Sequence, residues 1–425
     1  MNSETASSAG RPSSIHVVLT VLALTGLALF ILACRPSWSP DGQRLLYSYW
    51  DKGTKSGAVA VFDRKTRTSR VIWVGSYAEA GESDMVPVAA QWSVDGEQAV
   101  VTICAEKTAD VLVLPFRSPK PARRFALKAL GSSPYSPFPQ IGSRVFVGNK
   151  RGAYRLDLEN GEILENIMEK ELDADSGLML FESNQKVMYM ANLKTETPAA
   201  AKKEEKSTEE KPANTVEFGE VDSKDLSFHA TQTLTAADLK AKGLSDVSAF
   251  TDVEPKGQRL ALVGQRLGDE RPAIVILEHD QIVKVLDVGG KSKEDSVGNP
   301  QWSRDAKFIY VPALLQNETT TTTELAIVEV PLDGKNPRID RIMEGPTSDF
   351  DDDYTIFAQI ALSPDGKLIA LSNGYDKNIR PEKKGIFLLD VSQPGRPVSF
   401  YPAPALPALP EKPAAKPETK PAAKE

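Results

Sequence analysis

A turn signature, WSPDG, recurs in degraded form along this chain of 425 residues, and an apolar run follows each copy. The better copies are RPSWSPDGQRLLYSY (35–49), AAQWSVDGEQAVVTI (89–103), NPQWSRDAKFIYVPA (299–313) and QIALSPDGKLIALSN (359–373). Pro pre-sets φ, Asp bonds the nearby backbone and Gly supplies a positive φ, so each copy predicts a β-hairpin. A hairpin that returns at a near-constant interval restricts the fold to a repeat architecture.

Three weaker copies lie between the better ones, at 132–148, 177–191 and 250–264. Successive copies are about 43–60 residues apart, except where a low-complexity stretch lengthens one interval. In the copy at 132–148 we align Tyr135 with the tryptophan of the better copies. The residues that define the better turns are candidates for a structural role, and they are Trp38, Asp41, Gly42, Trp92, Asp95, Gly96, Trp302, Asp305, Asp365 and Gly366.

A second apolar run follows each turn, as in GAVAVFD (57–63), and a more polar run often closes the unit, as in RKTRTSRVIWV (64–74). Each unit therefore predicts four antiparallel strands. Many of these runs are apolar on both faces, which is expected of sheets packed between two neighbours. Four-stranded sheets repeated radially form a β-propeller.

This pattern resembles the WD40-like repeats of TolB-type β-propellers, and the resemblance covers residues 35–402. It implies an all-β fold, a seven-bladed β-propeller of four-stranded antiparallel blades, with six or eight blades as alternatives. The innermost strand of the first blade should begin near Pro36. The seventh unit supplies four strands of its own, so we expect the ring to close by side-chain packing between the first and last blades.

An apolar run from Ile15 ends in ILAC, directly before the first repeat, and predicts an N-terminal apolar helix. ILAC resembles the lipobox of bacterial lipoproteins, in which Cys34 would be the lipid attachment site. About 20 apolar residues can also cross the hydrocarbon core as an uncleaved anchor. Residues 1–34 are therefore a signal peptide or a membrane anchor, with plain secretion as a third alternative. Both main alternatives predict an exported domain tethered at the periplasmic side of the cell envelope.

Two segments have too few large apolar side chains to offset the entropy of ordering them. Residues 194–214, KTETPAAAKKEEKSTEEKPAN, fall between the second and third strands of the fourth unit and predict a disordered insertion. Residues 403–425 are rich in Pro, Ala and Lys and predict a disordered tail with polyproline character.

The composition argues against several kinds of chemistry. The net charge is −7, which disfavours a nucleic-acid partner because such proteins need a basic face. Only His229 and His279 lie outside the apolar leader, which disfavours metal and general-base schemes. The sequence contains no G-x-S-x-G, P-loop, HExxH or CxxC motif. Cys104 lies in a predicted strand, where we expect a buried apolar residue.

Four aspartates gather in SDFDDDY (348–354), and they are weak candidates for a calcium site: Asp349, Asp351, Asp352 and Asp353. Calcium prefers six to eight oxygen ligands, but the regular spacing and the glycine of an EF-hand loop are missing. We therefore expect a solvated loop here, and neither a metal nor a cofactor.

The repeat without a catalytic motif predicts a non-enzymatic, membrane-tethered scaffold, a monomer that binds an envelope protein or a small ligand on one propeller face. The alternative is a carbohydrate- or peptide-processing hydrolase or lyase with its site at the channel mouth. A third hypothesis is a sensor that holds a small molecule in the channel. Carboxylates and an arginine converging at the channel mouth would favour the enzyme, and a bland channel would count against it.

Overall fold

The computed structural model describes most of the repeat region and little outside it. The predicted leader 1–34 with Cys34, the insertion 194–214 and the aspartates of 348–354 lie outside the described residues. The described residues are 35–51, 56–76, 86–105, 108–116, 121–127, 138–148, 152–170, 172, 178–193, 215–279, 281–290, 292, 295–317, 322–346, 359–373, 383–393 and 395–406.

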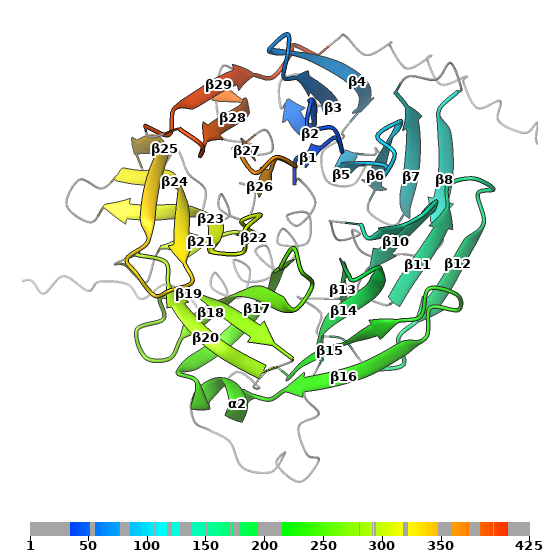
Figure 1. Ribbon diagram of the computed structural model, residues 1–425. Coiled ribbons are helices and arrows are strands. Elements are labelled where there is room, and N and C mark those ends of the chain that lie inside the picture. Colours follow the sequence, from blue (N-terminus) through cyan, green and yellow to red (C-terminus); the bar gives the residue numbers. More distant parts are fainter. Residues whose placement is uncertain are drawn as a thin grey trace, which may run out of the picture.

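Seven antiparallel sheets stand around a central axis, so the predicted seven-bladed β-propeller is confirmed (Figure 1). Each sheet consists of strands that are consecutive in the chain. The first four blades consist of β1 (Ser37–Trp38), β2 (Arg44–Asp51), β3 (Ser56–Asp63) and β4 (Thr68–Ser76); β5 (Val86–Trp92), β6 (Gln98–Ala105), β7 (Thr108–Pro115) and β8 (Arg123–Leu127); β9 (Gln140–Ile141), β10 (Arg144–Gly148), β11 (Gly152–Asp157) and β12 (Ile163–Ile167); β13 (Leu178–Ser183), β14 (Lys186–Leu193), β15 (Thr215–Val221) and β16 (Phe228–Leu234).

The last three blades follow the same order, except that two short inner strands, β21 and β22, both pair with β23 in blade 6. These blades consist of β17 (Leu244–Val253), β18 (Arg259–Arg266), β19 (Pro272–Glu278) and β20 (Gln281–Asp287); β21 (Ser296–Val297), β22 (Gln301–Trp302), β23 (Phe308–Asn317), β24 (Thr322–Pro331) and β25 (Arg338–Pro346); β26 (Gln359–Leu362), β27 (Leu368–Ser372), β28 (Gly385–Asp390) and β29 (Val398–Pro402).

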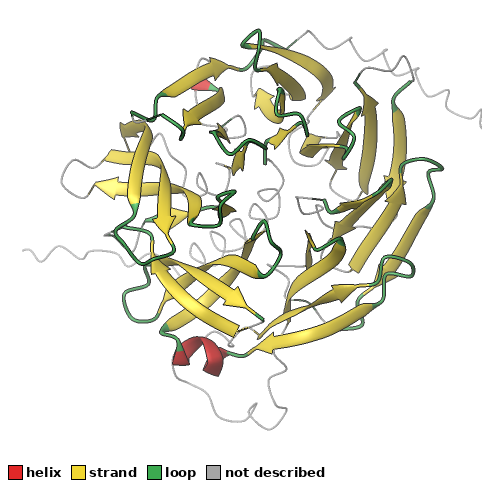
Figure 2. Ribbon diagram, in the orientation of Figure 1, coloured by secondary structure: helices red, strands yellow, loops and turns green. Residues whose placement is uncertain are grey.

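In every blade the first strand lies nearest the axis and the fourth strand lies at the rim (Figure 1). Because the strands alternate in direction, the first-to-second and third-to-fourth turns of all blades meet at one end of the ring, which we call the tight-turn face. The second-to-third connections and the links between blades meet at the other end, the loop face. The short helix α2 (Ala236–Ala241) lies in such a link, at the rim between blades 4 and 5 (Figure 2).

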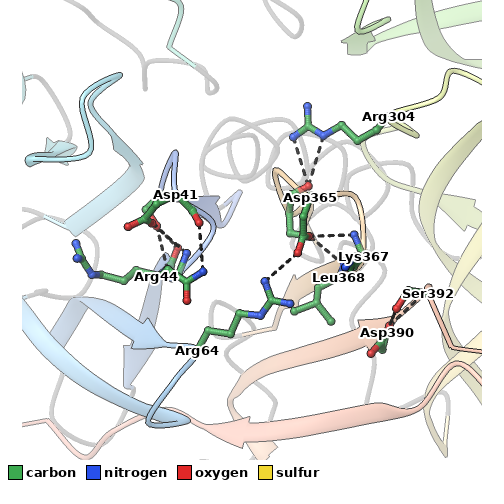
Figure 3. Close-up of polar contacts among 12 residues, drawn as sticks. Asp41, Arg44, Arg64, Arg304, Asp365, Lys367, Leu368, Asp390 and Ser392 are labelled. Carbon is green, nitrogen blue, oxygen red and sulfur yellow. Dashed lines mark hydrogen bonds and ion pairs between the residues drawn. The ribbon is translucent and has the colours of Figure 1, made fainter.

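The repeated turn is held by its serine and aspartate together. Ser39 Oγ donates to Asp41 Oδ1 over 2.6 Å, and Asp41 Oδ1 accepts the backbone N–H of Gln43 at 3.0 Å. Ser39 Oγ also accepts the N–H of Arg44 at 2.9 Å, and Gly42 takes φ +66°. The same serine–aspartate bond recurs in blades 2, 6 and 7, and Figure 3 shows the blade 7 turn around Asp365.

The tryptophans of the repeat join neighbouring blades. Trp38 Nε1 donates to the carbonyl of Ala361 in blade 7 over 3.0 Å, and Trp302 Nε1 donates to the carbonyl of Asp252 in blade 5 over 3.1 Å. Both indoles are buried, as is Trp92 in blade 2. The indoles of Trp38 and Trp302 thus fill the space between two sheets, and each satisfies a backbone acceptor of the preceding blade.

Blades 3 and 4 replace the repeated turn by two-residue hairpins, which explains why their copies are weak. Blade 3 turns at Gly142–Ser143, so the alignment on Tyr135 is wrong: the inner strand is β9, and Tyr135 lies outside the described residues. Blade 4 turns at Asn184–Gln185, whose φ angles of +52° and +61° are those of a type I′ hairpin. Such a turn needs no Pro, Asp or serine.

A second turn recurs where the third strand ends. Asp63 Oδ1 accepts the backbone N–H groups of Lys65 and Thr66, both at 2.9 Å, and the bond from Thr66 is the main reason that the pKa of Asp63 lies below its usual value. Asp157 and Asp390 occupy the same place in blades 3 and 7 and accept equivalent bonds. These aspartates shape the third-to-fourth turns of the tight-turn face.

The ring closes by packing between blades 1 and 7, without strand exchange among the described residues. Phe62 and Tyr401 pack with tilted rings whose centroids lie 4.7 Å apart, and Arg64 pairs with Asp365 at 3.1 Å (Figure 3). Residues 403–406, the first residues of the predicted tail, continue from β29 onto blade 1. Their packing there adds to the closure, since Tyr49 Oη donates to the carbonyl of Pro404 over 2.6 Å. Residues 407–425 lie outside the described residues.

Candidate functional site

A cavity of about 390 Å³ opens at the tight-turn end of the central channel. Residues from blades 1 to 5 line it, including Ser37, Gln91, Glu182 and Asp252, and Val94 stands at its rim with 60% of its surface exposed. We call it the channel-mouth cavity. A rigid concavity that collects polar side chains from several strands is the usual form of a ligand site.

Most polar side chains in the channel-mouth cavity join one blade to the next. Gln91 donates to the carbonyl of Phe138 over 2.6 Å and accepts the N–H of Phe138 at 2.8 Å. Gln140 bonds back to the carbonyl of Trp92 and to the N–H of Val94, both at 3.1 Å. These amides are therefore committed to the ring itself.

Asp252 and Arg35 meet in the channel, an arrangement of the kind that would favour the enzyme hypothesis. Arg35 donates from Nε to the carbonyl of Ile360 over 3.2 Å, donates to Gln301 Oε1, and lies 3.8 Å from Asp252 Oδ1. Asp252 Oδ2 also accepts the N–H of Trp302 at 2.7 Å and an amide hydrogen of Gln301 at 2.8 Å. We call these contacts the Arg35 clasp; they bind blade 1 to blades 5, 6 and 7.

Burial raises the pKa of Asp252, and the nearby Arg35 opposes that rise. Both oxygens of the carboxylate face donors of the protein, so the group acts as a fixed acceptor. The convergence of acid and arginine that could have signalled catalysis thus serves ring closure.

Glu182 differs from the other polar groups of the channel-mouth cavity. No hydrogen bond or ion pair joins its carboxylate to any residue that the structure describes. Partial burial raises the pKa of Glu182, since the carboxylate loses part of its hydration. An unpaired carboxylate at the mouth of a rigid channel can accept hydrogen bonds from a ligand or pair with its positive charge.

The two histidines outside the leader lie apart. His229 is exposed on β16, where its Nε2 lies 3.0 Å from Ser227 Oγ. His279 takes φ +45° in the turn after β19 and lines a cavity of about 290 Å³ between blades 4 and 5. In the described part of the chain, no three His, Cys, Asp or Glu side chains are grouped to hold a metal ion. Among the described residues, no helix is long and apolar enough to cross a bilayer.

A larger cavity of about 830 Å³ lies at the rim around β25. Two of its lining side chains, Arg396 and Asp340, bond each other, with Asp340 Oδ2 at 2.7 Å. Arg396 also bonds Glu329 Oε2 at 2.5 Å, and all three side chains are about 10% exposed. Arg396 follows β28 in blade 7, whereas both acids belong to blade 6. This buried triad therefore fixes two blades to each other.

The sequence matches no family model and no curated protein. Among solved structures, the chain is similar to a provisionally assigned 6-phosphogluconolactonase from Bacteroides uniformis, at 12% identity and a TM-score of 0.50 over 84% of this chain and 94% of that one. A protein from Lactobacillus plantarum and the β-propeller domain of Cps50 (Swd1) from Myceliophteria thermophila each give 12% identity and a TM-score of 0.49 over 84% of this chain and 95% or 97% of theirs. These likenesses concern the fold alone.

Apart from Trp92 and Trp302, which the repeat marks as structural, the sequence does not single out the residues of the channel-mouth cavity and the Arg35 clasp. One signal was present: the position directly before the repeat tryptophan is Ser37, Gln91 and Gln301 in three of the better copies, and Asp252 in a weaker one. A polar side chain at the end of an innermost strand is unusual for a strand packed in a core. It marks the positions that face the channel.

Proposed function

We propose that the protein is a non-enzymatic scaffold of the cell envelope, exported and held at the membrane through its N-terminus, that binds a partner at the channel-mouth cavity. The supporting observation is the state of that cavity. Its glutamines and Asp252 are bonded within the ring, so its rigid wall offers Glu182 and the exposed Val94 for recognition. Export and tethering rest on the apolar run that ends in Cys34.

Crosslinking in intact membranes followed by pull-down tests this function. The wild-type chain should recover one specific envelope protein, and Glu182→Lys or Val94→Asp should abolish its recovery. Lys335→Glu is the matched control, because Lys335 lies on the same face, is 81% exposed and lies outside the channel-mouth cavity. Equal recovery with all three variants would contradict binding at the cavity, and recovery of no partner would contradict the scaffold itself.

Mass spectrometry of the mature N-terminus tests the tether. An acylated Cys34 supports a lipoprotein, and an N-terminus at Met1 in the membrane fraction supports an uncleaved anchor. An unmodified chain that begins near Arg35 and stays in the aqueous fraction would contradict both.

The alternative is a hydrolase or lyase for a carbohydrate or peptide, and Glu182 is the observation that favours it. A carboxyl group with a raised pKa beside a cavity can act as a general acid. Incubation with polysaccharide and peptide libraries should then show turnover that Glu182→Gln removes and Lys335→Gln retains. Turnover with this pattern would replace the scaffold by an enzyme.

A further inference from the structure

The first described residue of the chain lies in the channel. The backbone of Arg35 leads into β1 of blade 1, yet its side chain contacts Ile360, Gln301 and Asp252 in blades 7, 6 and 5. A side chain can reach these inner strands from blade 1 only across the channel. The Arg35 side chain is 13% exposed, so it is enclosed there. The chain therefore enters the propeller close to the axis of the ring.

The direction of entry follows from the strand order. β1 leads directly into the first turn of the tight-turn face, so Arg35 and Pro36 lie on the loop-face side of β1. The C-terminal end of the described repeat also lies at the loop face. There the N–H of Ala403 donates to the carbonyl of Lys384, beside the start of β28. Neither described chain end leaves from the tight-turn face.

From this geometry we infer that the membrane anchor meets the propeller on its axis, so that the loop face lies against the lipid surface and the channel-mouth cavity points away from it. This inference rests on the proposed tether. Cys34 directly precedes Arg35, and one residue spans at most about 3.6 Å. The clasp therefore leaves the anchor almost no freedom to move sideways. An axial attachment holds all seven blades at a similar height above the bilayer, whereas attachment at one blade would let the ring lean to that side.

Depth-dependent fluorescence quenching tests the arrangement with the full chain in phosphatidylethanolamine–phosphatidylglycerol vesicles that carry brominated acyl chains. A fluorescent amino acid is placed singly at exposed loop-face positions in three different blades, Glu169, Glu270 and Glu344. A second set occupies exposed tight-turn positions, Asp95, Lys256 and Lys335.

The three loop-face positions should be quenched to the same extent within about twofold, and the tight-turn positions should not be quenched. Quenching at the tight-turn face would overturn the inference. Quenching concentrated on one loop-face position would overturn it as well. A chain that stays in solution would overturn the tether together with this inference, so the two failures are distinguishable.

Arg35→Ala tests the role of the clasp. With the clasp broken, the three loop-face signals should diverge by more than twofold, whereas Arg64→Ala should leave them equal. Arg64 is a matched control because it joins blades 1 and 7 at the tight-turn face, outside the channel. Equal signals in a folded Arg35→Ala variant would contradict the clasp as the positioning element. If that variant does not fold, the six wild-type positions still decide the orientation.

Discussion

Replacing Arg396 by Met should destabilise the propeller, because it leaves two buried acids without their shared cation. Arg396 bonds Glu329 and Asp340 at 2.5 and 2.7 Å, and the three side chains are 11%, 9% and 9% exposed. Burial alone would lower the pKa of Arg396, but the bonds to both carboxylates raise it above its usual value. Arg396 therefore stays charged across the physiological pH range.

The magnitude follows from what remains after the substitution. Removing one partner of a buried ion pair costs about 3–5 kcal/mol. Asp340 keeps Arg338, whose Nε lies 3.0 Å away, so Glu329 is the main orphaned charge and the lower end, about 3 kcal/mol, is expected. For a folded ring of this size, that loss lowers Tm by about 4 °C.

Thermal and denaturant unfolding of purified variants measure the effect. Arg396→Met combined with Glu329→Gln should recover much of the loss, because the orphaned charge is then gone. Lys335→Met is the matched control: its ion pair with Asp333 has a similar length of 2.7 Å but lies in solvent, so little change is expected. An unchanged Tm for Arg396→Met, or a double variant that is less stable than the single one, would refute the reasoning.

Three further predictions concern the turns. Ala306→Gly should raise the free energy of unfolding by about 0.5 kcal/mol in denaturant titrations, because Ala306 takes φ +57° where other blades use glycine; a loss of stability would contradict this. Backbone N–H bonds lower the pKa of Asp63 below its ordinary value of 3.8. The stability that Asp63 contributes is therefore fully present above pH 3.8 and is lost as the pH falls through the lower pKa of the folded state. The Tm of Asp63→Asn should thus fall less than the Tm of the wild type between pH 5 and about pH 2.5; an equal fall in both would contradict this. Replacing 194–214 by a two-residue turn should retain the fold, since Leu193 and Thr215 are directly paired. The shorter loop should raise the free energy of unfolding by about 1–2 kcal/mol, because it costs less entropy to close; an unfolded product would show that the segment is structural.

The repeat and the blade count could be predicted because their signals are local. A turn such as SPDG specifies its own geometry through the Ser39–Asp41 bond and a glycine at positive φ, whatever surrounds it. The alignment at Tyr135 is wrong because it relies on the same local signal. The Ser-Pro dipeptides around Tyr135 resemble the repeat, but blade 3 turns at Gly142–Ser143. A two-residue hairpin carries too little sequence to compete with such a signal.

The candidate site could not be predicted in the same way, because its chemistry depends on contacts between distant segments. Glu182 lines a cavity only after five blades have assembled around it. Asp252 lies in one of the weaker copies; the neighbouring blade brings it to Trp302, and only the closed ring brings it to Arg35. Blade-to-blade geometry decides which polar residues are committed to the ring and which remain for a ligand.

The Arg35 clasp also bears on how the chain reaches its final form. Arg35 is separated from Gln301 by 266 positions and from Ile360 by 325, so its acceptors emerge from the ribosome long after it does. Loop closure over such distances is slow compared with the formation of a hairpin. Individual blades can form as they are synthesised. The Arg35 guanidinium can bind its acceptors only after blade 7 has formed, so we expect this contact to form at the end of folding.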